Sequence, residues 1–163
     1  MSWVLCRDSC DADRVDRIDR ELLRLLCSDA RATYNDLGRA VRLSANTVSE
    51  RVRRLRAAGV VKGYRAQLDP HALGRQLTMV SDVRLREGMD RGIFEKGLES
   101  VPQVVAGSRL TGEYDFQLRV SCVDATEFEG VVDTLKRDHG VRECRSRLIL
   151  HDLALDESRL LDL

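Results

Sequence analysis

Residues 43–55 have the sequence LSANTVSERVRRL, and this stretch decides the N-terminal half of the fold. Its apolar residues Val48, Val52 and Leu55 recur at four- and three-residue spacing, so they fall on one stripe of a helix at about 100° per residue. Ser44 stands just before the pattern, where its hydroxyl can accept a hydrogen bond from a first-turn N–H group. We therefore predict a helix that begins after Ser44 and buries this stripe.

The other side of this helix is polar and basic, with groups that suit base edges and phosphates. Upstream, residues 34–41 form a second short helical pattern, and Arg42 and Leu43 remain as a tight turn. Two short helices joined in this way are typical of a helix-turn-helix. A two-helix hairpin whose basic face simply meets water has the same pattern. The predicted DNA-binding residues are Ser44, Asn46, Thr47, Glu50, Arg53 and Arg54.

We expect these residues to act according to their chemistry. Asn46, Thr47 and Glu50 should approach base edges, because asparagine pairs with adenine and glutamate accepts from cytosine. The two later arginines of the set should mainly hold phosphates. Arg51 lies nearer to the apolar stripe and is a candidate for bracing the domain instead.

The charge is divided along the chain, although 27 Lys and Arg balance 27 Asp and Glu overall. Residues 14–75 hold 14 basic and 7 acidic residues, a net charge of +7. Residues 76–163 hold 12 basic and 17 acidic residues, a net charge of −5. A basic half joined to an acidic half indicates that one part meets a polyanion, although chance asymmetry between two domains would look the same.

Length and composition narrow the class of protein. The 163 residues, 43% of them hydrophobic, allow one medium or two small globular domains. Neither a membrane span nor a signal peptide is evident, so we expect a cytoplasmic protein. The five cysteines form neither a disulfide framework nor a paired zinc pattern. A redox or metal role for Cys6 and Cys10 is the alternative to a reduced, loosely ordered N-terminal segment.

No group of residues has catalytic or metal-ligand spacing. His71, His139 and His151 are isolated, and the G-x-S-x-G, P-loop and G-x-G-x-x-G patterns are missing from the sequence. We therefore predict no catalytic residues, no cofactor and no metal. The competing function is a metabolic enzyme subunit, or a small-molecule-sensing module that does not bind DNA. A nucleoid-organising protein with little sequence preference is a third possibility.

The second half has a different period. Strand patterns at 77–85, 103–110, 114–122 and 141–150 alternate with helical patterns at 91–100 and 124–138. The order β-α-β-β-α-β is that of a ferredoxin-like sandwich, whose sheet has one open face that a second subunit usually covers. The fold class is therefore α+β. We expect an N-terminal extension at 1–13, a helix-turn-helix domain at 14–59, an extended arm and linker at 60–75, a ferredoxin-like ligand-binding and oligomerisation domain at 76–151, and a tail at 152–163.

A short turn in this second half has features of a ligand site. Residues 111–115 have the sequence TGEYD, and Gly112 can adopt a positive φ that bares backbone N–H groups. Such groups can hold a carboxylate, and Asp115 could hold an α-ammonium group, which together suit a free amino acid. A plain hairpin whose charges face water explains the same residues.

The chain resembles the Lrp/AsnC family of feast/famine transcriptional regulators from about Val15 to His151. The similarity rests on residues 15–31, the helix of residues 44–55, residues 58–64 (AGVVKGY), residues 68–74 and the TGEYD turn. Arg42 replaces the family's usual glycine, Ala45 a common proline and Glu113 the usual aspartate. If position 42 needs a positive φ, its arginine costs about 1 kcal/mol.

The resemblance implies a function and an assembly. It implies a sequence-specific regulator that binds double-stranded DNA at a pseudo-palindromic operator, as homodimers that assemble into tetramers or octamers. The arm at 60–68 and the open sheet face at 77–85 are the expected dimer surfaces. It also implies a small effector, an amino acid, bound near the turn between neighbouring dimers. The expected effector-binding residues are Ser108, Leu110, Thr111, Gly112, Glu113, Tyr114 and Asp115.

Overall fold

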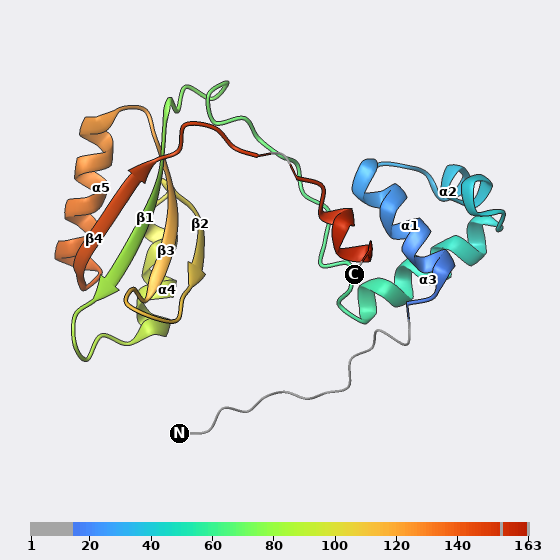
Figure 1. Cartoon of the computed structure of the whole chain (residues 1–163), viewed down its shortest axis with the longest axis horizontal. Coiled ribbons are helices and arrows are strands. Elements are labelled where there is room, and N and C mark those ends of the chain that lie inside the picture. Colours follow the sequence, from blue (N-terminus) through green and yellow to red (C-terminus); the bar gives the residue numbers. More distant parts are fainter. Residues whose placement is uncertain (1–14, 154, 163) are drawn as a thin grey trace. The chain divides into compact units, whose positions relative to one another are not determined.

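The computed structural model describes residues 15–153 and 155–162, shown in Figure 1. The described residues form two compact units, one of residues 15–66 with 155–162 and one of residues 67–153. The expected extension at 1–13, with Cys6 and Cys10, lies outside them. The boundary between the units, after Ala66, falls inside the expected arm, and residues 155–162 cluster with the first unit.

The first unit is built on helices α1 (Arg17–Ser28), α2 (Tyr34–Val41) and α3 (Ala45–Ala57). Helix α1 begins with a reciprocal cap, because the Asp16 side chain accepts the Asp19 N–H at 2.8 Å and the Asp19 side chain accepts the Asp16 N–H at 3.2 Å. The apolar stripes of all three helices meet in one core, made by Leu22, Leu26, Leu37, Val48 and Val52. This arrangement confirms the predicted helix-turn-helix.

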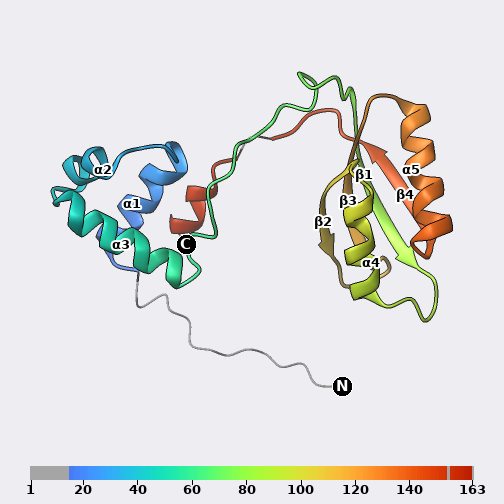
Figure 2. The ribbon, with the colours of Figure 1, turned by 180° about the vertical axis from the view of Figure 1, so that it is seen from behind.

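The second unit is a ferredoxin-like α+β sandwich. Its elements are β1 (Leu77–Leu85), α4 (Arg91–Gly97), the short 3-10 helix η2 (Leu98–Ser100), β2 (Val104–Arg109), β3 (Phe116–Cys122), α5 (Ala125–Asp138) and β4 (Val141–Leu148). The four strands form one antiparallel sheet in the order β2-β3-β1-β4, seen from opposite sides in Figures 1 and 2. The predicted order β-α-β-β-α-β is confirmed.

The two faces of this sheet differ in chemistry. One face carries the core, in which Val83 and Leu118 pack with Phe94 of α4 and Leu135 of α5. The other face is polar at its centre, because Asp82 accepts hydrogen bonds from Gln117 at 2.9 Å and from Arg147 at 2.5 Å. The open face expected to contact a second subunit therefore has a charged centre.

Strand β2 lies at an edge of the sheet and is irregular. Among the described residues it pairs only with β3, and the register shifts between Val104 and Ala106, so that Val105 is an extra residue in the strand. Its residues are exposed from Val105 to Arg109. This edge is therefore short and bulged.

The connection between α3 and β1 contains neither helix nor strand. It ends at Arg75, whose guanidinium group donates to the Ser121 carbonyl oxygen at 3.1 Å and to the Glu127 carboxylate at 3.3 Å. Arg75 thereby fastens the end of the arm to the second unit. Within residues 15–153 and 155–162, the helices are too short or too polar to cross a membrane.

Candidate nucleic-acid interface and effector turn

The turn between α2 and α3 is tight and strained. Arg42 adopts the left-handed conformation with φ 57°, and a Cβ atom on Gly38 would lie 2.5 Å from the carbonyl oxygen of Leu43. The Leu43 N–H group donates to the Gly38 carbonyl oxygen at 2.9 Å, which closes the turn. The positive φ at position 42 is therefore real, and the arginine there accepts a strain that glycine would avoid.

The start of α3 is held by side chains that were expected to meet DNA. The Ser44 hydroxyl accepts the Thr47 N–H at 3.2 Å, which confirms the predicted cap. The Ser44 and Thr47 hydroxyl groups also share a hydrogen bond of 2.9 Å. Both residues are thus occupied in forming the first turn, although both remain exposed.

The free side of α3 presents the remaining predicted DNA-binding residues. Asn46 is exposed, and Arg53 pairs with Glu50 at 2.7 Å while both side chains remain more than two-thirds exposed. The opposite side of the helix is buried at Val48 and Val52. This exposed pair is open to exchange, because a surface ion pair contributes at most about 1 kcal/mol.

Arg51 and Arg54 make a different kind of contact. Both donate to Asp19 of α1, Arg51 at 2.9 Å and Arg54 at 2.5 Å, and the Asp19 side chain is fully buried. Arg51 also reaches Asp16 at 2.6 Å. The expectation that Arg51 braces the domain is confirmed. Arg54, expected to hold phosphate, also braces α3 against α1.

Hydrogen bonds within this cluster shift the pKa values of Asp16 and Arg51. The pKa of Asp16 lies below its usual value, chiefly because the Asp19 N–H donates to it and then because Arg51 donates to it. The pKa of Arg51 is correspondingly raised by Asp16 and Asp19. The local sequence carried no signal for this cluster, since Asp19 and its two arginines lie more than thirty residues apart.

The TGEYD turn between β2 and β3 is anchored to neighbouring strands. Arg84 of β1 pairs with Glu113 at 2.9 Å, and its guanidinium group lies 5.3 Å from the centre of the Tyr114 ring. The Tyr114 hydroxyl donates to Glu143 of β4 at 3.2 Å. These contacts fix both flanks of the turn.

Asp115 already has two donors. One oxygen accepts the Leu85 N–H at 2.9 Å, and the other accepts from Arg91 at 2.8 Å. The pKa of the Asp115 carboxyl is held below its usual value, chiefly by the Leu85 N–H group and less by Arg91. The structure thus gives this carboxylate a role in joining the turn to β1 and α4, besides the expected role toward an ammonium group.

The tip of the turn is open. Gly112 adopts φ 106°, and a Cβ atom there would meet nothing within 4 Å. Among residues 15–153, no acceptor is found for the backbone N–H groups of Thr111, Gly112 and Glu113. Ser108 and Leu110 are exposed beside this tip. A groove of about 350 Å³ along β2 and α4 includes Ser108 but none of residues 111–115.

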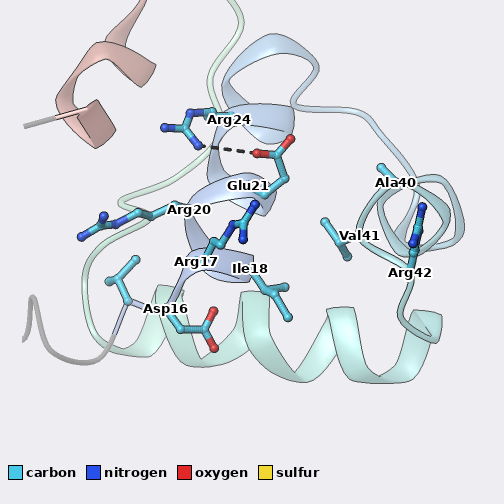
Figure 3. A pocket seen from close by; sticks show the side chains of 10 residues that line it. Asp16, Arg17, Ile18, Arg20, Glu21, Arg24, Ala40, Val41 and Arg42 are labelled. Carbon is cyan, nitrogen blue, oxygen red and sulfur yellow. Dashed lines mark hydrogen bonds and ion pairs between the residues drawn. The ribbon is translucent and has the colours of Figure 1, made fainter.

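A third feature was not predicted as a site. An open cleft of about 1240 Å³ lies between α1 and α2, and Figure 3 shows its lining. It combines four arginines with two acids and an apolar floor: Arg17, Arg20, Arg24, Arg42, Asp16, Glu21, Val15, Ile18, Ala40 and Val41. The Arg24 and Glu21 side chains are 3.5 Å apart within it. The charged side of α1 is thus a second basic surface of the first unit, besides the exposed side of α3.

Known proteins match both units. Residues 15–62 match the winged helix-turn-helix DNA-binding family, and residues 78–158 match the Lrp/AsnC ligand binding domain. The HTH-type transcriptional regulator LrpA of Mycobacterium tuberculosis is 31% identical over 148 residues, which are 91% of this chain and 98% of that protein. The leucine-responsive regulatory protein of Escherichia coli K12 is 29% identical over 85% of this chain and 87% of its own length.

A solved structure agrees with these matches. A transcriptional regulator of Neisseria meningitidis in complex with L-methionine superposes with a TM-score of 0.80 at 31% identity, over 88% of this chain and 94% of that one. Fold, order of domains and sequence therefore agree along most of the chain. The chain belongs to the Lrp/AsnC family of DNA-binding transcriptional regulators.

Proposed function

We propose that this regulator binds a pseudo-palindromic DNA operator through α3 and that a free amino acid controls it. The exposed side of α3 supports the proposal of DNA binding, because Asn46, Glu50 and Arg53 project from a helix whose other side is buried. A helix of this kind fits the major groove. Two copies about one helical turn apart, roughly 34 Å, contact the two halves of such an operator.

The contacts of each residue suggest its role on DNA. Asn46, Thr47 and Glu50 approach base edges, and Ser44 holds the first turn in place. Arg53 exchanges its exposed partner Glu50 for a phosphate. Arg54 keeps Asp19 with one nitrogen and turns its exposed half toward the backbone of DNA.

A salt titration tests these roles. We expect fluorescence anisotropy to show binding of a random-sequence duplex at low salt, with affinity falling steeply as salt increases. Arg53→Ala should reduce the magnitude of the log–log salt slope by about 0.9 for each bound subunit, the value for one phosphate contact. Asn46→Ala should leave the slope unchanged and lose preference for duplexes that the wild-type protein selects from a random pool.

Two outcomes would overturn this assignment. Lack of duplex binding at low salt would exclude DNA recognition. A changed sequence preference in Arg53→Ala with an unchanged slope would reverse the roles of Arg53 and Asn46. Arg137→Ala, which removes an exposed arginine on α5, is the matched control and should alter neither quantity.

The effector site is proposed at the tip of the TGEYD turn. The open N–H groups of Thr111, Gly112 and Glu113 suit the carboxylate of an amino acid. Asp115 is expected to attract the ammonium group while it remains bonded to Leu85 and Arg91. Ser108 and Leu110 line the approach, and a neighbouring subunit supplies the rest of the pocket. The relatives named for leucine and solved with L-methionine favour an aliphatic side chain.

Thermal-shift measurements with each of the twenty amino acids test this site. We expect L-leucine or L-methionine to raise the melting temperature, and Gly112→Val to abolish that rise because valine strongly disfavours φ near 106°. Gly130→Ala on α5 is the control and should preserve the response. A shift that survives both Gly112→Val and Asp115→Ala would place the effector elsewhere.

We further propose that homodimers form and assemble into tetramers or octamers. The polar open face of the sheet and the arm at 60–68 are the proposed contacts. Arg145→Glu would place a negative charge beside its register partner Asp82, on the sheet face proposed as the dimer contact. Because this charge would disturb that contact, we expect sedimentation velocity to show dissociation. Lys136→Glu on α5 is the control. A wild-type monomer at every concentration would contradict the proposal.

We also infer that the chain is not an enzyme and acts in the cytoplasm. The known relatives are transcriptional regulators, and the proposed task requires access to chromosomal DNA. The same salt titration separates this function from an enzyme subunit or a sensing module without DNA binding, since neither would bind duplex at low salt.

A further inference from the structure

The end of the chain packs on the DNA-binding domain. After β4, the chain leaves the second unit and forms a 3-10 helix, η3 (Glu157–Asp162), which contacts α1 within the first unit. The second unit is therefore connected to the first by two stretches of chain, residues 58–76 and residues 149–156. Sequence patterns had indicated only the first.

The start of η3 is formed by its own side chains. Asp156 accepts the Ser158 N–H at 2.8 Å and the Ser158 hydroxyl at 2.7 Å. In a 3-10 helix, residues three apart lie on one side. Ser158 and Leu161 are the half-buried residues of the helix, whereas Leu160 is 70% exposed. The helix thus has one contacting side and one free side.

Charges on the two helices are complementary. Arg24 of α1 pairs with Asp162 at 2.5 Å. One turn further along α1, the Cys27 side chain is exposed; partial desolvation raises the pKa of its thiol, and the nearby carboxylates of Asp156 and Glu157 raise it further. The acidic segment therefore lies along α1 from Cys27 to Arg24.

We propose that residues 156–162 are a second tether, which docks on the Arg24–Cys27 side of α1 and restricts the movement of the DNA-binding domain relative to the effector domain. A segment this short binds weakly by itself. Because it is covalently attached, its local concentration is in the millimolar range, so weak contacts suffice to hold it in place for much of the time. Events at the end of β4 then reach α1 through the tether, as well as through the arm.

Cys27 is a built-in reporter of docking. In the full-length chain, we expect Leu161→Ala to increase the rate of Cys27 alkylation by iodoacetamide, measured by mass spectrometry of the Cys27 peptide, because release takes two carboxylates away from this exposed thiol and so favours its thiolate form. Leu160→Ala, on the free side, is the matched control and should leave the rate unchanged. Equal rates in the wild-type protein and Leu161→Ala would overturn the docking.

The ion pair gives an independent test. Asp162→Arg should increase the Cys27 alkylation rate, and adding Arg24→Asp should restore it toward the wild-type rate. Failure of the double variant to recover, with both variants folded by circular dichroism, would show that this pair does not hold the tether.

Restricted movement is measured directly by ¹⁵N relaxation. We expect Leu161→Ala to shorten the rotational correlation time of the DNA-binding domain in the full-length protein, while that of the effector domain stays the same. Leu160→Ala should shorten neither. An unchanged correlation time in Leu161→Ala, together with faster Cys27 alkylation, would show docking without restriction and would refute the tether.

Discussion

The helix-turn-helix and the TGEYD turn are both short charged segments, but their charges are held differently. On the free side of α3, Glu50 and Arg53 pair with each other and remain exposed. In the turn, Glu113 and Asp115 are bonded to residues of β1 and α4. The first surface is ready to exchange partners with DNA. The second is a fixed frame around a small set of open N–H groups.

Within the DNA-binding domain, Asp19 differs from the exposed charges of α3 because its carboxylate is buried and paired. Removing this carboxylate should have the largest effect on stability. Asp19→Asn removes a buried carboxylate from Arg51 and Arg54, so we expect a loss of about 3 kcal/mol in the free energy of unfolding, at the low end for buried pairs because Arg54 is half exposed. Calorimetry of the full-length protein measures it. Glu21→Gln, which affects an exposed pair, should cost little. Equal losses in the two variants would mean that the buried cluster contributes no more to the free energy of unfolding than an exposed ion pair.

Gly38 tests how tightly the turn between α2 and α3 is packed. Gly38→Ala would place Cβ 2.5 Å from the Leu43 carbonyl oxygen, and we expect a loss of about 2 kcal/mol in stability. Gly130→Ala, on an open part of α5, should instead stabilise the protein by up to about 1 kcal/mol. Chemical denaturation of both variants measures the difference, and a neutral Gly38→Ala would show that the turn can relax.

The contribution of Asp115 to the stability of the turn is expected to depend on pH. Because its pKa in the folded protein is lowered, its contribution to stability is present above the pKa of an unfolded aspartate, about 3.9, and is lost as pH falls through the lower folded value. We expect Asp115→Asn to be about 1.5 kcal/mol less stable than wild type at neutral pH, with the difference shrinking below about pH 4. Urea titrations across this pH range measure it. A pH-independent difference would assign the loss to packing.

The smallest effect is expected at Arg42. Because this residue has φ 57°, Arg42→Gly should raise the free energy of unfolding by about 1 kcal/mol. Arg39→Gly, within α2, should lower it by a similar amount because glycine disfavours a helix interior. Thermal unfolding of the pair provides the measurement, and destabilisation by Arg42→Gly would give the arginine side chain a structural contact that outweighs the strain.

Local patterns predicted the elements well. The bounds of β1 agree with the structure, and so does the cap at Ser44, because an apolar period and a cap are properties of neighbouring residues. Strand β4 was expected to reach Leu150 but ends at Leu148, since the end of a strand depends on its partner. Pairs such as Asp19 with Arg54 join residues far apart in sequence, and no local pattern indicates them.

The same reason explains what the sequence left open in the candidate sites. The exposed residues of α3 follow from helical spacing alone. The donors to Asp115 depend on how β1 lies beside β3, which requires the completed sheet. The docking of η3 on α1 joins the two ends of the chain and had no signal in either segment.

The bulge in β2 has a consequence for the behaviour of the protein at high concentration. An exposed edge strand offers unpaired backbone groups to any other extended chain, which is the first step of aggregation by strand addition. The extra residue Val105 twists the edge and interrupts the regular spacing of those groups. Deleting Val105 should straighten the strand and space these backbone groups regularly. We therefore expect the folded protein to aggregate into insoluble fibres through this edge.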